Sequence, residues 1–419
     1  MPPVFPPRGA RTVLGAAAAC VLTLIPLLTP AKAQEPSAPQ PVSPAQLQAA
    51  IDKLGDLDYA TRTTAGRTIR RASAAQAVPA LLQAVAEHAD GYVRYRALVL
   101  LSGFGDPRTE DAVRESLRSP NDRLRATAYS FYEHTPDILM AQALLAALDR
   151  EQAEFVRPAL VRAIASLGQL LSDPVRARRA PPGDRARVEQ ALVGDAGRGE
   201  DFFRSAVIEA LGDYKAGYAV DALIAIAKLD GPLQDDAALA LGKIGDKRAL
   251  ETLAGLQATA PRVSQPAIAT AICLLGVNCG SHETYVADML AFADKNLGHQ
   301  DLLRSAATGL AALSVAGHAE AVEALFDIGI AAKDDATRAP VALAVGTVAL
   351  RNTALMLSVV EKRPSREAAL ALLADGFDML EEDLDKERFF AFARHTYWGA
   401  PEGSPTRALM QMLIGRLDF

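Results

Sequence analysis

Histidine and cysteine are the residues of this chain best suited to metal or nucleophilic chemistry. None of the six histidines has a second histidine in His-x-x-x-His or His-Glu-x-x-His spacing, which would place two ligands on one helix face. The sequence also lacks a Gly-x-Ser-x-Gly elbow, a phosphate-binding Gly-x-x-x-x-Gly-Lys-Ser/Thr loop and a dinucleotide fingerprint. We therefore expect no enzyme activity, no catalytic residue, no metal site and no cofactor.

Cys273 and Cys279 are the two cysteines that would remain after removal of an N-terminal leader. A helix would hold them about 9 Å apart at ~1.5 Å per residue, which is too far for a disulfide. Gly276 lies between them and can turn the chain back. In an oxidising compartment this predicts a disulfide, with two buried free thiols as the alternative.

Tyrosine and arginine, the side chains most enriched at binding hot spots, gather in residues 92–132. Tyr92 and Tyr95 are three apart, as are Tyr129 and Tyr132, so each pair shares one helix face. This favours a partner-binding surface, although packing between repeats explains some tyrosines equally well. The predicted contact residues are Tyr92, Tyr95, Arg96, Arg123, Tyr129 and Tyr132.

An arginine-rich segment at 171–185 forms a second candidate site. Its three prolines exclude a continuous helix, so we expect an inserted loop. Insertions in solenoids often reach a ligand, and a run of arginines attracts an anionic partner. The alternative is a solvated insertion without a role. The residues predicted to bind are Arg176, Arg178 and Arg179.

The elements that would position these residues recur along the chain. An arginine followed by an alanine-rich amphipathic stretch returns at spacings of 32, 31, 32, 47, 100, 34 and 28 residues. We expect these arginines to form a structural ladder, by bridging to an acid or to helix-end carbonyl groups of the adjacent repeat. The alternative is that they line a concave face and bind an acidic partner. They are Arg62, Arg94, Arg125, Arg157, Arg204, Arg304, Arg338 and Arg366.

Glycine follows many of these stretches and predicts a left-handed C-cap that ends the helix. Examples are Gly103, Gly168, Gly212, Gly245 and Gly276. A second helix with apolar residues at i, i+3, i+4 and i+7 comes next, as in residues 219–227 and 249–256. Two helices every ~32 residues must stack on their neighbours to bury their apolar faces. The sequence predicts an all-α fold, a right-handed α-solenoid of about ten helical hairpins.

The segment Gln234-Asp-Asp-Ala-Ala-Leu-Ala-Leu-Gly-Lys-Ile-Gly-Asp-Lys-Arg-Ala-Leu250 resembles the HEAT-repeat family, especially its short bacterial form related to phycobilisome-lyase HEAT-like repeats. The resemblance covers about residues 50–380 and implies the architecture, whereas members bind very different things. The deoxyhypusine hydroxylases of this fold use several His-Glu dipeptides, but only His282-Glu283 occurs here.

The domain boundaries follow from these patterns. We expect a repeat array over 46–380, interrupted at 171–185, and C-terminal capping helices over 381–419. Aromatic residues between Phe389 and Trp398 would cover the open face of the last repeat, with a ligand site as the alternative.

Residues 1–33 have the pattern of a cleavable signal peptide. Arg8 and Arg11 precede an apolar run over 13–28, shorter than the ~20 residues of a membrane span, and Ala31-Lys32-Ala33 forms a cleavage site. An uncleaved anchor is the alternative. We expect cleavage after Ala33, a proline-rich linker over 34–45, and a soluble periplasmic or secreted protein without a membrane span.

Charge excludes one class of partner. The formal net charge is -6, and loss of the three positive charges of residues 1–33, which carry no acid, takes it to -9. Nucleic-acid binding requires clustered cations, so we expect no nucleic-acid partner. The leading hypothesis is a scaffold that binds a protein or peptide along its concave face. The alternatives are a lyase-related enzyme or maturation factor, and a glycan-binding component of the cell envelope.

Overall fold

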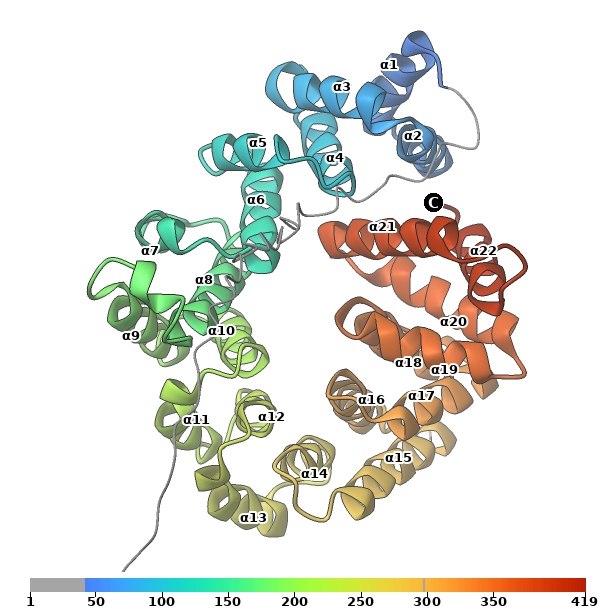
Figure 1. Ribbon diagram of the computed structural model, residues 1–419. Helices are drawn as coiled ribbons and strands as arrows, with labels where there is room; N and C mark the ends of the chain where they lie inside the picture. The colour runs from blue at the N-terminus through green and yellow to red at the C-terminus, as the bar shows by residue number, and fades with distance from the viewer. Residues whose placement is uncertain (1–41, 297) are drawn as a thin grey trace, which may run out of the picture. The chain divides into compact units, whose positions relative to one another are not determined.

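Helices account for the regular secondary structure of residues 42–296 and 298–419, which the computed structural model describes (Figure 1). No strand occurs in these residues. The helices are α1 (Pro44–Asp52), α2 (Tyr59–Arg71), α3 (Ala74–Glu87), α4 (Gly91–Ser102), α5 (Thr109–Ser116), α6 (Asp122–His134), α7 (Ala141–Leu148), α8 (Arg157–Ser172), α9 (Asp184–Ala196), α10 (Asp201–Asp213), α11 (Val220–Ala227), α12 (Gln234–Ile244), α13 (Leu250–Thr259), α14 (Gln265–Leu274), α15 (Cys279–Lys295), α16 (Gln300–Val315), α17 (Ala319–Ala331), α18 (Asp335–Arg351), α19 (Thr353–Lys362), α20 (Arg366–Met379), α21 (Asp383–Gly399) and α22 (Pro405–Leu417).

The first helix begins inside the predicted linker. Ser43 and Gln46 form a reciprocal capping box: the Ser43 hydroxyl accepts from the Gln46 amide (3.2 Å), and the Gln46 side chain accepts from the Ser43 amide (2.9 Å). Ordered helix therefore starts at Pro44, two residues before the predicted boundary. The predicted signal peptide and its cleavage site lie outside the described residues.

Consecutive helices pair into hairpins that stack on one another. Each odd-numbered helix contacts the even-numbered helix that follows it, from α1/α2 to α21/α22. Each even-numbered helix from α2 to α18 also contacts the next even-numbered one, which gives a continuous inner layer (Figure 1). These stacked pairs confirm the predicted α-solenoid.

Two of the predicted glycine C-caps have the left-handed backbone that the prediction requires. Gly245 (φ 85°) ends α12, and Gly276 (φ 78°) follows α14. Gly103 ends α4 in a right-handed conformation (φ -70°). The prediction is wrong for Gly168 and Gly212, which lie within α8 and α10.

Close packing of the inner helices explains why Gly212 and Gly242 lie inside helices. A Cβ atom on Gly212 would lie 2.8 Å from the Cα of Ala240 on α12. A Cβ atom on Gly242 would lie 2.5 Å from the Cα of Ala271 on α14. Such distances are shorter than atomic contact allows, so these glycines let neighbouring inner helices approach closely.

The inserted segment is shorter than the predicted 171–185. Helix α8 continues to Ser172 and α9 begins at Asp184, and a short 3-10 helix, Ala177–Arg179, lies between them. Arg176, Arg178 and Arg179 are exposed there.

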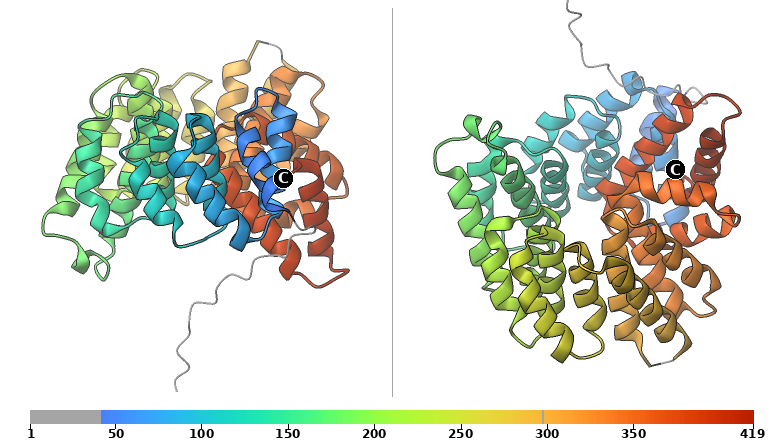
Figure 2. Two further views of the ribbon diagram at one scale, coloured as in Figure 1. Left: turned by 90° about the horizontal axis from the view of Figure 1, so that it is seen from above. Right: turned by 60° about the horizontal axis from the view of Figure 1, so that its bottom comes forward.

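The C-terminal hairpin contacts both the end and the beginning of the array. Helix α21 packs against α18, and α22 against α19 and α20, as expected for a cap. Helix α21 also contacts α4 and α6, far away in the sequence. Figure 1 and both views of Figure 2 place α21 beside these N-terminal helices. We call this contact of α21 with α4 and α6 the closure contact.

Among the described residues no single helix is long and apolar enough to cross a membrane. The pair α18 and α19 passes the same test together, but the two helices are bent by 118° at their junction.

Candidate functional site

A cavity of about 1080 Å³ lies between the inner helices. Its lining comes from α6, α8, α10, α12, α14, α16, α18 and α21, so residues more than 200 positions apart face one space. Concave spaces of this kind, with apolar and charged walls, are the usual binding sites of proteins. We therefore treat it as the candidate site and call it the inner cavity.

The apolar wall of the inner cavity carries three large side chains that remain exposed. Val315 on α16, Leu343 on α18 and Phe392 on α21 are 38%, 41% and 45% exposed, and all three line the cavity. Neighbouring large apolar groups left in contact with water mark interaction sites more often than isolated ones do.

The opposite wall begins with an ion-pair chain across α6, α8, α10 and α12. Arg162 donates to Glu133 (Nε–Oε1 2.8 Å) and to Asp213 (Nη1–Oδ2 3.0 Å). Lys243 donates to Asp213 (2.7 Å), and the Tyr214 hydroxyl donates to Glu133 (2.7 Å). Each charge of the chain thus has an opposite charge in direct contact, which offsets the cost of its burial.

A second group of charges joins α18 and α21 to α6. Arg351 lies 2.9 Å from Glu382, 3.4 Å from Asp385 and 3.8 Å from Glu133. The Nε2 atom of His134 lies 2.7 Å from Asp385 Oδ1. The two groups share Glu133 and form one network around the cavity.

Glu209 on α10 lines this wall with its side chain exposed to the cavity. The surrounding walls partly desolvate its carboxylate and raise its pKa, and the nearby carboxylates of Asp213 and Asp236 raise it further against the opposing effect of Lys243. Asp213 differs: burial would raise its pKa, but Lys243 and Arg162 outweigh burial and lower it. The cavity thus holds excess negative potential at Glu209, where a cation is favoured.

Further ion pairs connect α21 to the first repeats at the closure contact. Arg70 on α2 donates to Glu387 (2.7 Å), and Arg96 on α4 lies 2.9 Å from Asp383. The Tyr95 hydroxyl also donates to Asp383. A Cβ atom on Gly103 would lie 2.5 Å from Glu387 Oε1, so the glycine at the end of α4 leaves room for that carboxylate.

The predicted tyrosine surface is largely internal. Tyr95, Tyr129 and Tyr132 are 5%, 2% and 1% exposed, so they lack the accessible area that contact with a partner requires. Packing between repeats, the alternative drawn from the sequence, accounts for all three. Tyr92 is half-buried, and the Arg123 guanidinium lies 5.8 Å from its ring centre.

The inner cavity contains none of the residues predicted to bind a partner. Arg96 pairs with Asp383 at the closure contact instead. Arg176 lies 3.6 Å from Asp173, and the three loop arginines do not line the cavity. The acidic run Glu381–Glu387 supplies Glu382 and Asp385 to the inner cavity, and Asp383 and Glu387 to cations on α4 and α2, but the run by itself does not identify these partners.

The repeat arginines bind backbone carbonyl groups and acids, but only two of them make the contact with an adjacent repeat that the predicted ladder requires. Arg125 with Glu151 and Arg338 with Asp375 reach an acid of the following hairpin, whereas the other polar contacts stay within the arginine's own hairpin. The contacts are Arg62 with Leu57 O (2.9 Å), Arg94 with Val85 O (2.7 Å), Arg125 with Glu151 (2.8 Å), Arg204 with Ala196 O (3.2 Å), Arg304 with Asp301 (2.6 Å), Arg338 with Asp375 (2.7 Å) and Arg366 with Glu361 O (2.9 Å). Arg157 instead lies 3.6 Å from the ring centre of Phe203.

Residues 47–132 and 78–165 match the family model described as HEAT repeats. The matched residues therefore contain HEAT repeats, as predicted, and stacked hairpins continue from there through the described residues to α22.

The solved structures to which this chain is similar are distant from it in sequence. The complex of CpcE and CpcF of phycocyanin lyase from Nostoc sp. PCC7120 is 19% identical, with a TM-score of 0.39 over 65% of this chain and 94% of that one. Importin beta is 14% identical (TM-score 0.41), covering 88% of this chain but 55% of importin beta. Yeast importin-beta (Kap95p) is 12% identical (TM-score 0.38), over 89% of this chain and 62% of that one. No curated protein matches the sequence.

Proposed function

We propose that this protein is an extracytoplasmic scaffold that holds a segment of a partner protein in the inner cavity. The observation that carries the proposal is that Val315, Leu343 and Phe392, all partly exposed, line the same cavity. An apolar side chain of a partner would remove these groups from water, which stabilises a complex by roughly 25 cal/mol per Å² of apolar surface.

The charged wall favours a segment that also carries a lysine or arginine. The carboxylates of Asp213 and Asp236 act on Glu209, and the raised pKa of Glu209 means that its ionised form is disfavoured there. A partner's cation beside Glu209 would compensate this charge and select for a basic residue next to an apolar one. The occupant proposed is therefore a peptide segment with both features.

Peptide selection with the purified protein tests this function. Peptides are selected from a random phage-displayed library, and their affinity is measured by fluorescence anisotropy. We expect selected peptides to combine apolar and basic residues, and Leu343→Asp on the cavity wall to weaken their binding at least about tenfold, or ~1.4 kcal/mol.

Leu57→Asp is the matched control, because Leu57 is 97% exposed and does not line the cavity. Its affinity should equal that of the unaltered protein. Equal losses in both variants, or a library that yields no binding peptide, would contradict the proposal.

The extracytoplasmic location is part of the same proposal and rests on the leader pattern of residues 1–33. Expression of the full sequence with a C-terminal tag, followed by cell fractionation and mass spectrometry, tests it. The expected product is exported and begins at Gln34. A full-length product retained in the cytoplasm would reject the location without affecting the binding test.

A further inference from the structure

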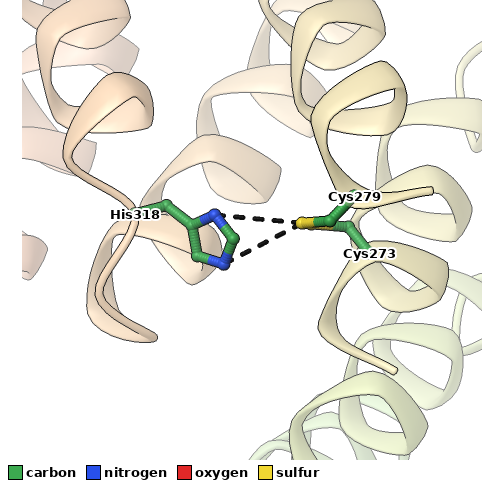
Figure 3. A group of neighbouring side chains, drawn as sticks. All are labelled: Cys273, Cys279 and His318. Carbon is green, nitrogen blue, oxygen red and sulfur yellow. Dashed lines mark hydrogen bonds between the residues drawn. A yellow bond between two sulfur atoms is a disulfide. The ribbon is translucent and has the colours of Figure 1, made fainter. Parts of the chain in front are cut away.

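Two cysteines and a histidine, none of which lines the inner cavity, meet at the junction of three helices. Cys273 lies near the end of α14, Cys279 is the first residue of α15, and His318 is the N-cap residue of α17 (Figure 3). One ligand atom from each lies within 4.8 Å of the other two. In the structure the cysteines form the predicted disulfide.

The backbone between the helices brings these side chains together. Gly276 (φ 78°) and Asn278 (φ 46°) both have left-handed conformations, so the chain turns back after α14. The Cα atoms of the two cysteines are consequently 4.0 Å apart. The site is therefore organised by local chain geometry as well as by the bond between the sulfur atoms.

The histidine ring faces this sulfur pair. Both ring nitrogens of His318, Nδ1 and Nε2, lie 3.9 Å from the Sγ atom of Cys279. In tetrahedral zinc sites, Zn–S distances of about 2.3 Å and Zn–N distances of about 2.0 Å place sulfur and nitrogen ligands roughly 3.5 Å apart. Metal binding therefore requires the two sulfur atoms, which are bonded in the structure, to separate to about 3.8 Å after reduction, and the His318 ring to turn one nitrogen toward them.

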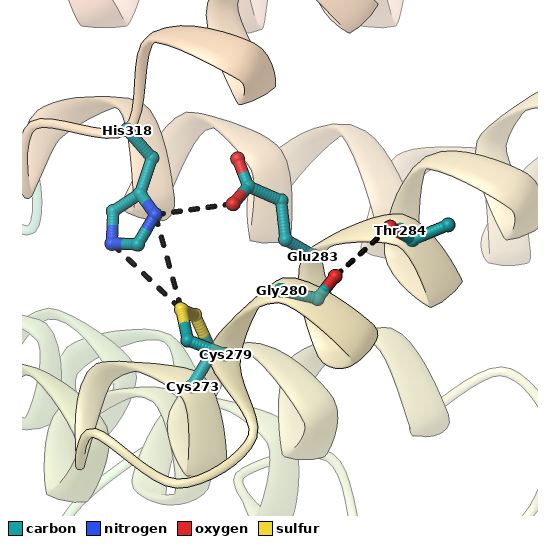
Figure 4. The surroundings of a disulfide bond; sticks show 6 residues. All are labelled: Cys273, Cys279, Gly280, Glu283, Thr284 and His318. Carbon is teal, nitrogen blue, oxygen red and sulfur yellow. Dashed lines mark hydrogen bonds and ion pairs between the residues drawn. A yellow bond between two sulfur atoms is a disulfide. The ribbon is translucent and has the colours of Figure 1, made fainter.

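Glu283 supplies the contact that orients such a histidine. It lies one helical turn after Cys279 on α15, and its Oε2 atom is 3.2 Å from His318 Nδ1 (Figure 4). With the Nδ1 proton directed at Glu283, the Nε2 lone pair is free to bind a metal, as in most protein zinc sites. The other oxygen, Oε1, is buried and has no hydrogen-bond partner among the described residues.

We propose that Cys273, Cys279 and His318 form a Zn²⁺ site when the cysteines are thiols, with Glu283 as the positioning residue. The disulfide and the metal are then alternative states of one cluster. A dithiol reductant supplies two electrons and two protons to open the disulfide and becomes a disulfide itself. Zn²⁺ then displaces both thiol protons, and the fourth coordination position is left for water or an added side chain.

The two states differ in which helices they connect. The disulfide joins only α14 and α15. The metal would also attach His318, and with it the start of α17 in the next repeat. Reduction in the presence of zinc would therefore replace a link between two consecutive hairpins, α13/α14 and α15/α16, with a link that also includes the third, α17/α18.

Metal titration of the whole protein tests the site. The protein is reduced without oxygen and titrated with Co²⁺ as a spectroscopic probe, and with Zn²⁺ in competition with a chromogenic chelator. We expect one equivalent of either metal, with the thiolate-to-cobalt absorption of a tetrahedral site. The oxidised protein should bind none.

Variants distinguish this site from adventitious binding. Cys279→Ser should abolish the thiolate-to-cobalt band, and Glu283→Gln should weaken zinc binding about 10-fold or more. His318→Ala should weaken it at least as much, whereas His299→Ala, an exposed histidine that packs against Phe292, should not change it. Circular dichroism confirms that each variant is folded.

Zinc uptake by the unaltered protein, reduced and oxidised, tests the proposal even if a variant does not fold. Absence of zinc uptake by the reduced protein, or equal uptake by the oxidised protein, would overturn the proposal. Equal affinity in His318→Ala would overturn it as well.

Discussion

Arg70 and Glu387 form a buried ion pair although 317 residues separate them in the sequence. Their side chains are 7% and 1% exposed, and the Nη2–Oε2 distance is 2.6 Å. Helix α2 belongs to the first hairpin and α21 to the last, so this pair joins the two ends of the array. An open solenoid has contacts only between neighbouring repeats, and this chain departs from that pattern.

Glu387→Gln is predicted to destabilise the protein strongly. Removing one partner of a buried ion pair leaves the other charge uncompensated, so the free energy of unfolding should fall by about 3 kcal/mol. Urea unfolding measures it. The matched control, Glu110→Gln, removes one charge of an exposed pair with Arg114 and should have no measurable effect. Equal effects of the two variants would show that the ion pair between α2 and α21 adds little stability.

Asp383→Asn is predicted to remove a pH-dependent part of the stability. Burial would raise the pKa of Asp383, but Arg96, Lys386 and the Tyr95 hydroxyl outweigh burial and lower it. A lowered carboxyl pKa stabilises the fold above the unfolded value of about 3.9, and this contribution is lost as pH falls through the folded value. Melting temperatures should differ between the two proteins at pH 6 (a pH chosen above ~3.9) and converge in acid. A pH-independent difference would contradict the assignment.

Glu209→Gln is predicted to have the opposite effect. The raised pKa of Glu209, caused first by partial desolvation and then by Asp213 and Asp236, means that its charge destabilises the fold above the folded pKa. Because the side chain is exposed and solvent screens its charge, the variant should melt only slightly higher at neutral pH, and the gain should disappear well below pH ~4, where the acid is protonated in both states. A lower melting temperature would mean that the carboxylate is compensated within the protein. Loss of peptide affinity in this more stable variant would indicate a binding role for Glu209.

Gly242→Ala is predicted to cost about 1–3 kcal/mol, because its Cβ atom would overlap Ala271 on the adjacent inner helix. Gly255→Ala on α13 is the matched control, since a Cβ atom there meets nothing within 4 Å. That control should stabilise the protein by about 0.5 kcal/mol through reduced backbone freedom. Chemical unfolding of both variants separates the packing effect from helix propensity.

Sequence patterns predicted the helices and their pairing because both depend on periodicity within ~32 residues. They assigned one role, a helix C-cap, to the glycines near the end of each amphipathic stretch, whereas the chain uses such glycines in two ways. Gly245 ends a helix, and Gly212 allows two helices to approach closely. Glycine can end a helix or allow two helices to approach closely. Only the position of the neighbouring helix shows which of the two roles a given glycine has.

The inner cavity and the closure contact were beyond sequence reasoning. Which residues face each other across the cavity depends on a small rotation accumulated from repeat to repeat. The pairing of Glu133 with Arg351, or of Tyr95 with Asp383, therefore has no local signal. The tyrosine spacing correctly predicted shared helix faces, but not that Tyr95, Tyr129 and Tyr132 would be buried.

The contact of α21 with α4 and α6 also constrains how this protein can evolve. Open arrays gain and lose whole repeats by duplication or deletion, because each repeat needs only its neighbours. Here one repeat more or fewer would move Asp383 and Glu387 away from Arg96 and Arg70. We expect homologous chains with this contact to keep a constant number of repeats, with length variation confined to segments such as 173–183.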